Sequence, residues 1–217
     1  ARLRPRSFSE YVGQQHLIAP GKMLRRAIEA DTFTSIILYG PPGIGKTSLA
    51  ELIATLTEAH FERLSAVISK VADVRQAVEA AKLRRRSGRR TILFIDEIHR
   101  FNRAQQDVLL PHVEHGHIRL IGATTENPFF QIVGPLISRS QVFRLEPIPD
   151  TDLRQLMNRA LTSEEGLGQY SVNLTPEAED FLIQVCEGDA RRLLTALELA
   201  VLSSCSDPDK KEPLILD

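Results

Sequence analysis

The sequence predicts an α/β protein with a parallel sheet, followed by a small all-α domain. Short apolar runs typical of buried strands alternate with helical patterns, and the segments between successive strands are too long for hairpins. A glycine-rich loop joins the first of these strands directly to a helix. The alternation ends near residue 147, in a segment with two prolines, and only helical patterns follow. These observations favour a sheet covered by helices on both faces, with a helical bundle appended.

Each element is placed by its pattern of apolar residues. Four short, largely apolar runs predict strands, at residues 35–39, 91–95, 118–123 and 142–145. Before residue 147, apolar residues at helical spacing predict helices at residues 47–57, 71–86 and 102–114. Beyond it, they predict helices at residues 151–161, 176–187 and 190–204. We therefore expect an α/β domain over residues 1–147 and a helical domain over residues 148–217.

The composition is that of an ordinary globular protein. Of 217 residues, 42% are hydrophobic, which is enough for a core, and the net charge of −1 demands neither nucleic acid nor a membrane surface. No apolar run approaches the ~20 residues that span a bilayer, and the basic start lacks the apolar stretch of a signal peptide. Cys186 and Cys205 predict neither a metal site nor a disulfide framework. We expect a cytoplasmic protein, and the two ends suggest a fragment of a longer chain.

The strongest motif is the segment Gly40-Pro41-Pro42-Gly43-Ile44-Gly45-Lys46-Thr47, which matches the pattern G-x-x-x-x-G-K-S/T. Glycines allow backbone N–H groups to point inward around phosphates, and the helix that follows offers its positive N-terminal end to the same anion. Lys46 can neutralise phosphate charge, and the hydroxyl of Thr47 is a hard oxygen ligand for Mg²⁺. The loop, together with Ser48, therefore predicts ATP binding; a glycine-rich turn with a chance lysine is the weaker alternative.

An acidic pair, Asp96 and Glu97, follows the predicted strand at residues 91–95. Parallel strands end at the same edge of a sheet, so this pair and the phosphate loop can face one ligand. Asp96 has the chemistry to hold Mg²⁺ together with Thr47, and Glu97 the chemistry to polarise an attacking water. A base directed at water favours a hydrolase over a P-loop kinase. The alternative is a solvated strand end, and His99 is interpreted as a surface or supporting histidine.

With these motifs in place, the chain resembles AAA+ ATPases, and one branch closely. Residues 4–16 are similar to the adenine-side box of clamp-loader-like members. Residues 96–130, with residues 64–67 and 188–192, are similar to the replication-associated recombination protein A family, also called MgsA or Werner-helicase-interacting protein. The resemblance covers about residues 2–205. It implies an AAA+ P-loop core with a parallel five-stranded sheet and an all-α lid. It also implies a DNA-dependent ATPase that acts in replication fork maintenance, recombination and DNA repair.

The resemblance implies further site residues. Thr125 falls where AAA+ proteins place a polar residue that positions the attacking water. Arg139 matches the arginine finger, which acts on the ATP held by an adjacent subunit, and Arg191 matches a lid arginine that contacts the γ-phosphate in its own subunit. Tyr11 and Val12 are expected to line the adenine pocket. The alternatives are an ordinary strand-end threonine, solvated arginines and interdomain packing.

Partners are expected mainly from the resemblance. It implies ATP, single-stranded, gapped or forked DNA, and single-strand-binding protein, with no membrane. It also implies a homo-oligomer, a tetramer in full-length members, built through a C-terminal domain beyond this chain. Six cations within residues 82–90 predict either a solvated helix end or a contact to DNA phosphates. A clamp-loader-type subunit, with ATP as a switch for partner and DNA binding, is the alternative function.

Overall fold

The computed structural model describes residues 3–204 and 214–216, and it contains a parallel sheet of five strands in the order β2-β3-β4-β1-β5. The strands are β1 (Ser35–Tyr39), β2 (His60–Ser65), β3 (Thr91–Asp96), β4 (Arg119–Thr124) and β5 (Gln141–Arg144). The helices around them are α1 (Gln15–Ile18), α2 (Met23–Glu29), α3 (Lys46–Leu56), α4 (Val71–Arg86), η1 (Ile98–Arg100), α5 (Arg103–Glu114), α6 (Pro128–Gln131) and α7 (Gly134–Ile137). The predicted α/β fold with a parallel sheet is confirmed.

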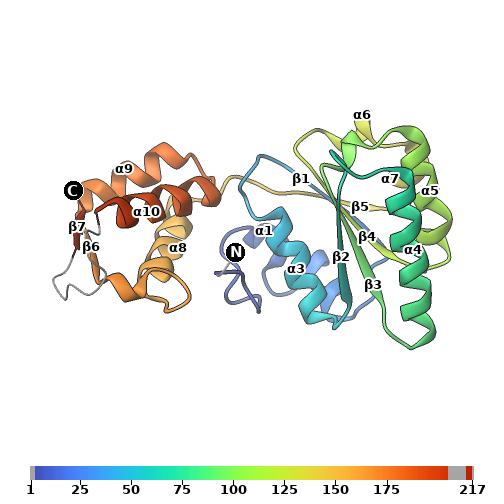
Figure 1. The fold of residues 1–217 in the computed structure, drawn as a ribbon, viewed down its shortest axis with the longest axis horizontal. Coiled ribbons are helices and arrows are strands. Elements are labelled where there is room, and N and C mark those ends of the chain that lie inside the picture. Colours follow the sequence, from blue (N-terminus) through green and yellow to red (C-terminus); the bar gives the residue numbers. More distant parts are fainter. Residues whose placement is uncertain (1–2, 205–213, 217) are drawn as a thin grey trace.

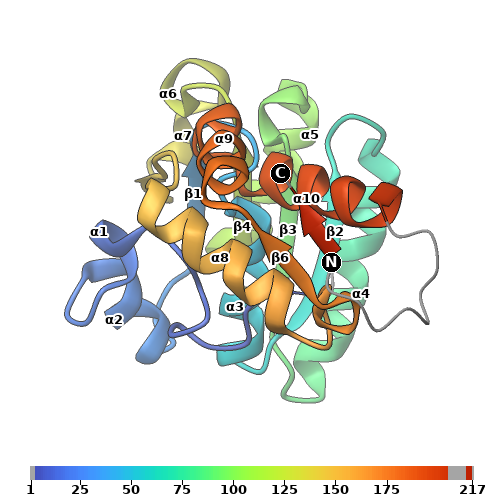
Figure 2. The same ribbon diagram turned by 90° about the vertical axis from the view of Figure 1, so that its left-hand side faces the viewer.

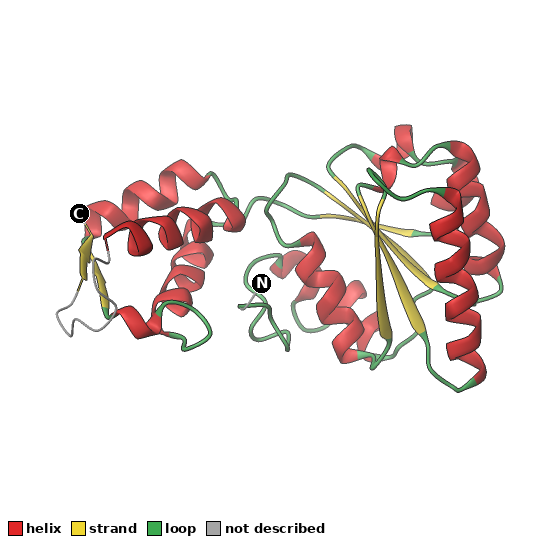
Figure 3. Ribbon diagram, viewed as in Figure 1, coloured by secondary structure: helices red, strands yellow, loops and turns green. Residues whose placement is uncertain are grey.

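Helices cover both faces of the sheet because successive residues of a strand point to opposite sides. On β1, Ile36 and Leu38 face a core shared with α1, α2 and α3, whereas Ile37 faces a second core shared with α4 and α5. All three side chains are fully buried. Figures 1 and 3 show the resulting layers, with α3 on one side of the sheet and α4 and α5 on the other. The strand ends are therefore held by packing on both faces.

The apolar pattern locates four of the five strands, and β2 is the strand that it misses. β2 is an edge strand that pairs only with β3. None of its residues is fully buried, and its sequence, HFERLS, mixes polar and apolar side chains. A strand at an edge needs no continuous apolar run, so its pattern in the sequence is weak. Residues carried by β2, including Arg63, are therefore absent from the predicted site residues.

We refer to residues 148–217 as the lid. Its three predicted helices are present as α8 (Asp150–Thr162), α9 (Pro176–Cys186) and α10 (Ala190–Ser204). The lid departs from an all-α domain in one detail, because a short turn, η2 (Gly168–Tyr170), leads to a parallel pair of three-residue strands, β6 (Val172–Leu174) and β7 (Leu214–Leu216). Pairing supplies hydrogen bonds to the extended backbone before α9. Strands this short leave no periodic signal in the sequence.

The lid has an apolar core of its own, formed among others by Leu153, Leu193 and Leu197. β5 ends at Arg144 and α8 begins at Asp150, which supports the proposed domain boundary near residue 147. Cys186 is a buried free thiol, and Cys205 lies outside the described residues. Within residues 3–204 and 214–216, no helix combines the length and the apolar character that a membrane span requires.

The lid is joined to the α/β domain by contacts from α8 and from the start of α10. On α8, Arg159 donates a hydrogen bond to the carbonyl oxygen of Glu10 (3.0 Å) and pairs with the Glu10 carboxylate (3.1 Å). At the start of α10, the N–H of Ala190 donates to the carbonyl oxygen of Gly43 in the phosphate loop (3.2 Å). Figure 2, which views the molecule from the lid side, shows α8, α9 and α10 in front of the sheet. The lid thus covers the sheet edge at which the phosphate loop lies.

Gln14 connects the phosphate loop to the segment that leads into the lid. The residue is 4% exposed. Its side-chain amide donates to the carbonyl oxygens of Glu146 (2.7 Å) and Ile44 (3.4 Å), and its side-chain oxygen accepts from the N–H of Glu146 (3.0 Å). One side chain therefore satisfies backbone groups from two segments that are far apart in the sequence.

Replacing Gln14 with Met should lower the free energy of unfolding by about 1–3 kcal/mol, because it keeps the volume of the side chain and leaves buried backbone groups without partners. Urea unfolding followed by circular dichroism measures the change. Gln15→Met is the matched control, since Gln15 is the next residue, is exposed as the first residue of α1, and should change stability by less than about 0.5 kcal/mol. Equal midpoints for the two variants would show that the Gln14 contacts do not contribute.

Candidate functional site

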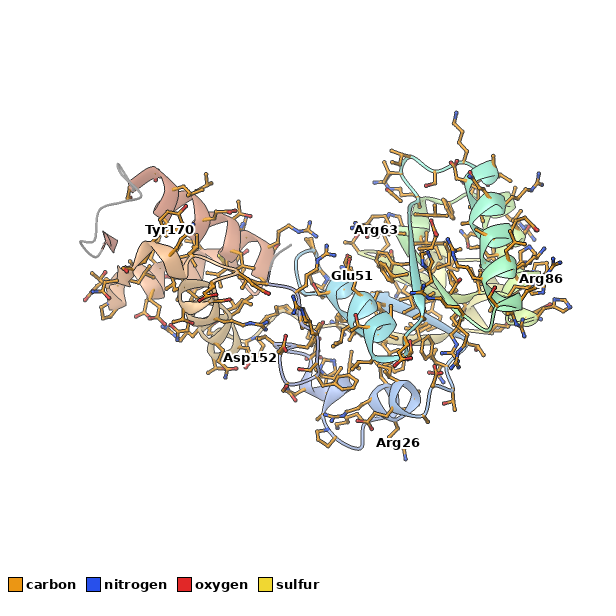
Figure 4. The ribbon with its side chains drawn as sticks, turned by 60° about the horizontal axis from the view of Figure 1, so that its bottom comes forward. Arg26, Glu51, Arg63, Arg86, Asp152 and Tyr170 are labelled. Carbon is orange, nitrogen blue, oxygen red and sulfur yellow. The ribbon has the colours of Figure 1, made fainter. Side chains whose placement is uncertain are left out.

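A cavity of about 390 Å³ lies between the α/β domain and the lid. Its wall combines the N-terminal segment, the phosphate loop, the acidic pair at the end of β3, and residues of α8 and α10. In Figure 4, Glu51 and Arg63 mark the side of the α/β domain toward the lid, and Asp152 lies on the lid near the junction. The cavity is therefore at the carboxyl edge of the sheet, where ligands bind in open parallel sheets.

The phosphate loop is shaped by glycines with left-handed backbones. Gly43 has a φ of 71° and Gly45 a φ of 98°, which residues with a side chain adopt only at a cost. A Cβ at Gly45 would lie 2.7 Å from the hydroxyl of the buried Tyr11. Ile44 turns into the core and is 1% exposed. Within the described residues, the N–H groups of Gly43 and Gly45 donate no hydrogen bond, so both are available to an anion.

Lys46, the first residue of α3, bonds to the loop that precedes it. Its Nζ donates to the carbonyl oxygens of Gly40 (2.7 Å) and Pro41 (2.6 Å). Burial lowers the pKa of Lys46, and the nearby carboxylates of Glu97 and Asp96 oppose that shift. Thr47 and Ser48 follow on the same turn and line the cavity together with Pro42. Positive charge and hydroxyl groups therefore lie at one end of the cavity.

Gly43 is the residue of the phosphate loop against which the side chain of Asp189 in the lid packs. A Cβ built there would lie 1.7 Å from Oδ1 of Asp189 and 2.0 Å from its Cγ, which is far inside van der Waals contact. The same Oδ1 accepts a hydrogen bond from the N–H of Arg192 in the first turn of α10 (2.9 Å). The start of α10 is therefore packed directly on the loop, and only glycine admits it at this position.

The strand order explains how Thr125 reaches the acidic pair. β4 lies between β1 and β3, so the residue that follows β4 lies between the phosphate loop and the residues that follow β3. Thr125 Oγ1 donates to Glu97 Oε2 at 3.4 Å. Glu97 has a left-handed backbone with a φ of 53°, a conformation that costs energy for a non-glycine residue and is frequent at functional sites. The structure thus brings Lys46, Asp96, Glu97 and Thr125 together at one edge.

His99 contacts the carboxylate of Glu97 and a buried threonine of β4. Its Nδ1 lies 3.3 Å from Glu97 Oε2 and 2.8 Å from the hydroxyl of Thr124, which is fully buried. The His99 side chain is only 10% exposed. Of the two interpretations of His99, the geometry agrees with a supporting residue and not with a surface residue.

Arg63 is a residue of the cavity that the sequence did not predict. β2 runs beside β3, and Arg63 Nη2 donates to Oδ2 of Asp96 at 2.6 Å. Its guanidinium carbon also lies 5.8 Å from the centre of the Phe94 ring. The signal that could have identified Arg63 is its place on a strand next to the acidic strand, which requires β2 to be recognised first. Asp96 thus has a cationic partner within its own chain.

The two predicted arginines lie in different places. Arg191 on α10 lines the cavity, and within the described chain it makes no ion pair or side-chain hydrogen bond. Its neighbour Arg192 lies 3.8 Å from the carboxylate of Glu187 instead. Arg139 follows α7, does not line the cavity, and pairs with Glu114 on α5. Arg191 is therefore placed to act in this cavity, and Arg139 is not.

Tyr11 and Val12 are both part of the cavity wall. Tyr11 is 4% exposed, its hydroxyl donates to the carbonyl oxygen of Gly45 (3.2 Å), and burial strongly raises its pKa. Val12 is partly buried against the core of the lid. Tyr11 and Val12 can therefore pack between the two domains and still lie beside a ligand in the cavity.

The basic run at residues 82–90 is largely engaged with the protein itself. Ion pairs join Lys82 to Glu79 (2.6 Å), Arg84 to Glu62 (3.1 Å) and Arg90 to Asp31. Arg85 donates to the carbonyl oxygen of His115 (2.6 Å), whereas Arg86 and Arg89 make no ion pair within the described residues. Figure 4 places Arg86 on the outer side of the α/β domain, away from the lid. This geometry favours the interpretation as a solvated helix end.

Comparisons with known proteins give the family of this chain. A family model described as the Holliday junction DNA helicase RuvB P-loop domain matches residues 3–140. Replication-associated recombination protein A of Escherichia coli is 47% identical over 213 residues, which cover 97% of this chain and 48% of that protein. An uncharacterised AAA domain-containing protein of Mycobacterium tuberculosis is 51% identical over 199 residues, which cover 92% of this chain and 44% of that protein. The chain thus spans about half the length of the curated relatives it matches.

Among solved structures, the Holliday junction branch migration motor RuvB of Thermotoga maritima matches with a TM-score of 0.74 and 27% identity, over 94% of this chain and 68% of that one. The similarity extends through the α/β domain into the lid. The resemblance to replication-associated recombination protein A, inferred above from sequence motifs, is confirmed by the relatives. By its phosphate loop, its parallel sheet and the family model that matches most of it, the chain belongs to the family of the Holliday junction DNA helicase RuvB P-loop domain.

Proposed function

We propose that this chain is the ATP-hydrolysing core of a AAA+ protein that acts on DNA in replication fork maintenance, recombination and repair. The observation that carries the proposal is the cavity in which Lys46, Asp96 and Glu97 of the α/β domain meet Arg191 of the lid. The name of the Escherichia coli relative, which refers to replication-associated recombination, supports the cellular context. We expect the protein to act in the cytoplasm and, in a bacterium, at the nucleoid.

The donor groups of the site fit the phosphates of ATP together with Mg²⁺. The free N–H groups of Gly43 and Gly45, with the Lys46 ammonium, suit phosphate oxygens. Thr47 and Asp96 would hold Mg²⁺, which neutralises phosphate charge when bound. The described residues contain no cluster of three or more His, Cys, Asp or Glu that could hold a metal. The phosphates of ATP and water would supply further oxygen ligands. Tyr11 and Val12 would line the adenine pocket.

Hydrolysis in this site would depend on positioning and on charge. Glu97 would orient and polarise the attacking water, while Thr125 and His99 hold its carboxylate in place. Arg191 would contact the γ-phosphate from the lid of the same subunit. Arg139, which does not line the cavity, would reach the γ-phosphate held by a neighbouring subunit. The active site would therefore be completed only in an oligomer, and full-length members of the family are expected to form tetramers.

DNA, single-stranded, gapped or forked, is the macromolecular partner that we propose, with single-strand-binding protein as a second. Both come from the resemblance to the recombination family. The geometry of the basic run does not add to this proposal, because three of its six cations form ion pairs within the chain and a fourth donates a hydrogen bond to a backbone carbonyl. A DNA contact would use other surfaces of the assembled protein.

Hydrolysis of Mg²⁺-ATP, measured against protein concentration with and without forked DNA at low salt, tests the proposal. Specific activity should rise with concentration, because Arg139 acts between subunits, and DNA should raise it further. Arg139→Ala should lower the maximal rate by about 10³-fold and leave ATP binding intact. A flat rate near zero with ATP bound would contradict the oligomeric site, whereas ATP-dependent capture of a sliding clamp would favour a clamp-loader subunit.

Glu97→Gln should bind ATP as tightly as the parent and hydrolyse it about 10²- to 10⁴-fold more slowly, because the amide cannot accept a proton from water. Equilibrium binding of a fluorescent ATP analogue and steady-state phosphate release separate the two effects. Glu126→Gln is the matched control, since Glu126 is exposed next to Thr125 and loses the same charge. Parent-like turnover in Glu97→Gln would assign the base to another residue.

Gly43→Ala should weaken ATP binding by about tenfold or more, because the methyl group would displace Asp189 and separate the lid from the loop. Gly21→Ala is the matched control: Gly21 has a similar φ of 82°, but an added Cβ there meets nothing within 4 Å. Calorimetric titration with ATP gives both affinities. If both variants bind like the parent, contact between lid and loop is not needed for binding.

A further inference from the structure

Arg139, the arginine proposed to act on a neighbouring subunit, is held by its own subunit. Its Nε pairs with Oε1 of Glu114 at 2.5 Å. Its Nη1 donates to the carbonyl oxygen of Pro135 (3.0 Å) and, more weakly, to the hydroxyl of Ser138 (3.3 Å). The Arg139 and Glu114 side chains are 43% and 41% exposed. The pair is therefore formed within the protomer and remains accessible to a second molecule.

Glu114 lies at a helix end that does not favour a carboxylate. Glu114 is the last residue of α5, where the negative end of the helix dipole disfavours a carboxylate. α5 packs against α7, and this packing brings Glu114 beside Arg139, which follows α7. Within the described residues, Arg139 is the cationic partner of Glu114. The pairing with Arg139 is thus the interaction that favours a carboxylate at this helix end.

A nucleotide phosphate on a neighbouring subunit would bind the same guanidinium group that Glu114 now holds through Nε. A guanidinium binds carboxylate and phosphate with the same planar set of N–H groups. The two anions therefore compete for Arg139, and the carboxylate is present in every protomer, whether or not a neighbour has arrived.

We propose that Glu114 is a latch, which retains Arg139 within its own protomer until an adjacent subunit presents a nucleotide phosphate. The inference rests on the function proposed above, because it requires Arg139 to act in trans. In the simplest version of this mechanism, Arg139 can contact the nucleotide of a neighbouring subunit only in the fraction of protomers in which Glu114 has released it. The apparent affinity between subunits is then reduced by that fraction. Glu114 in this way sets the protein concentration at which hydrolysis begins, without contacting the substrate.

The size of the effect follows from the exposure of the pair. A half-exposed ion pair changes an equilibrium by about two- to fivefold, and added salt reduces the change. Glu114→Gln keeps the shape of the side chain and removes its charge. It should therefore shift the concentration dependence of hydrolysis by that factor and leave the maximal rate unchanged.

Complementation between two variants of the full chain tests the latch. The acceptor carries Arg139→Ala, so it hydrolyses ATP only when a neighbour supplies the arginine. The donor carries Glu97→Gln, so it binds ATP and presents Arg139 but does not turn over. Donor is titrated into a fixed amount of acceptor, and phosphate release is measured. Donors with Glu114, with Glu114→Gln and with Asp107→Asn are compared; the last removes the same charge from an exposed position on α5, 3.9 Å from Arg103.

The Glu114→Gln donor should reach half-maximal stimulation at about two- to fivefold lower concentration than the parent donor, with the same plateau. The Asp107→Asn donor should match the parent. An unchanged or higher half-maximal concentration, or a lower plateau, for Glu114→Gln would overturn the latch and leave the trans role of Arg139 standing. If no donor stimulates the acceptor, the trans role itself fails, and the latch fails with it.

Discussion

The order of the five parallel strands is the constraint on which the candidate site depends. Because all strands run in one direction, their carboxyl ends meet along one edge, and the place of β4 between β1 and β3 decides which groups become neighbours there. The phosphate loop leaves β1, Glu97 follows β3, and Thr125 follows the strand between them. The hydrogen bond between Thr125 and Glu97 follows from that arrangement. Packing of helices on both faces then keeps the three segments at fixed separations.

The sequence predicts those parts of the site that are formed by residues adjacent in the chain. The phosphate loop and the acidic pair are read from consecutive residues beside strongly apolar strands, and both lie where they were expected. Arg63 was not predicted, because it enters from the polar edge strand β2 and meets Asp96 only through the pairing of β2 with β3. The pair of Glu114 with Arg139 joins two helices across a packing contact that no local pattern encodes. The short strands of the lid fall below the length at which periodicity is visible.

Most of the charged groups that we propose to act on ATP have a partner within the chain. Lys46 is bonded to carbonyl oxygens of the phosphate loop, Asp96 to Arg63, and Arg139 to Glu114. A charge removed from water without a partner is unfavourable, so these bonds stabilise the groups in the absence of phosphate. Binding would then exchange one set of partners for another. The net free energy of binding reflects the difference between the two sets, which is smaller than the contribution of the new set alone.

Gly43 has a consequence for communication between the two domains. The lid contacts the backbone of the phosphate loop there, and Asp189 fills the space that a side chain would occupy. A ligand that binds both the phosphate loop and the lid stabilises the arrangement in which the lid contacts the loop. By thermodynamic reciprocity, any interaction that holds them together tightens the binding of that molecule by the same factor. A substitution far from the cavity, between β5 and α8 or on the outer face of the lid, can therefore change the affinity of the site while every contact to the ligand remains the same.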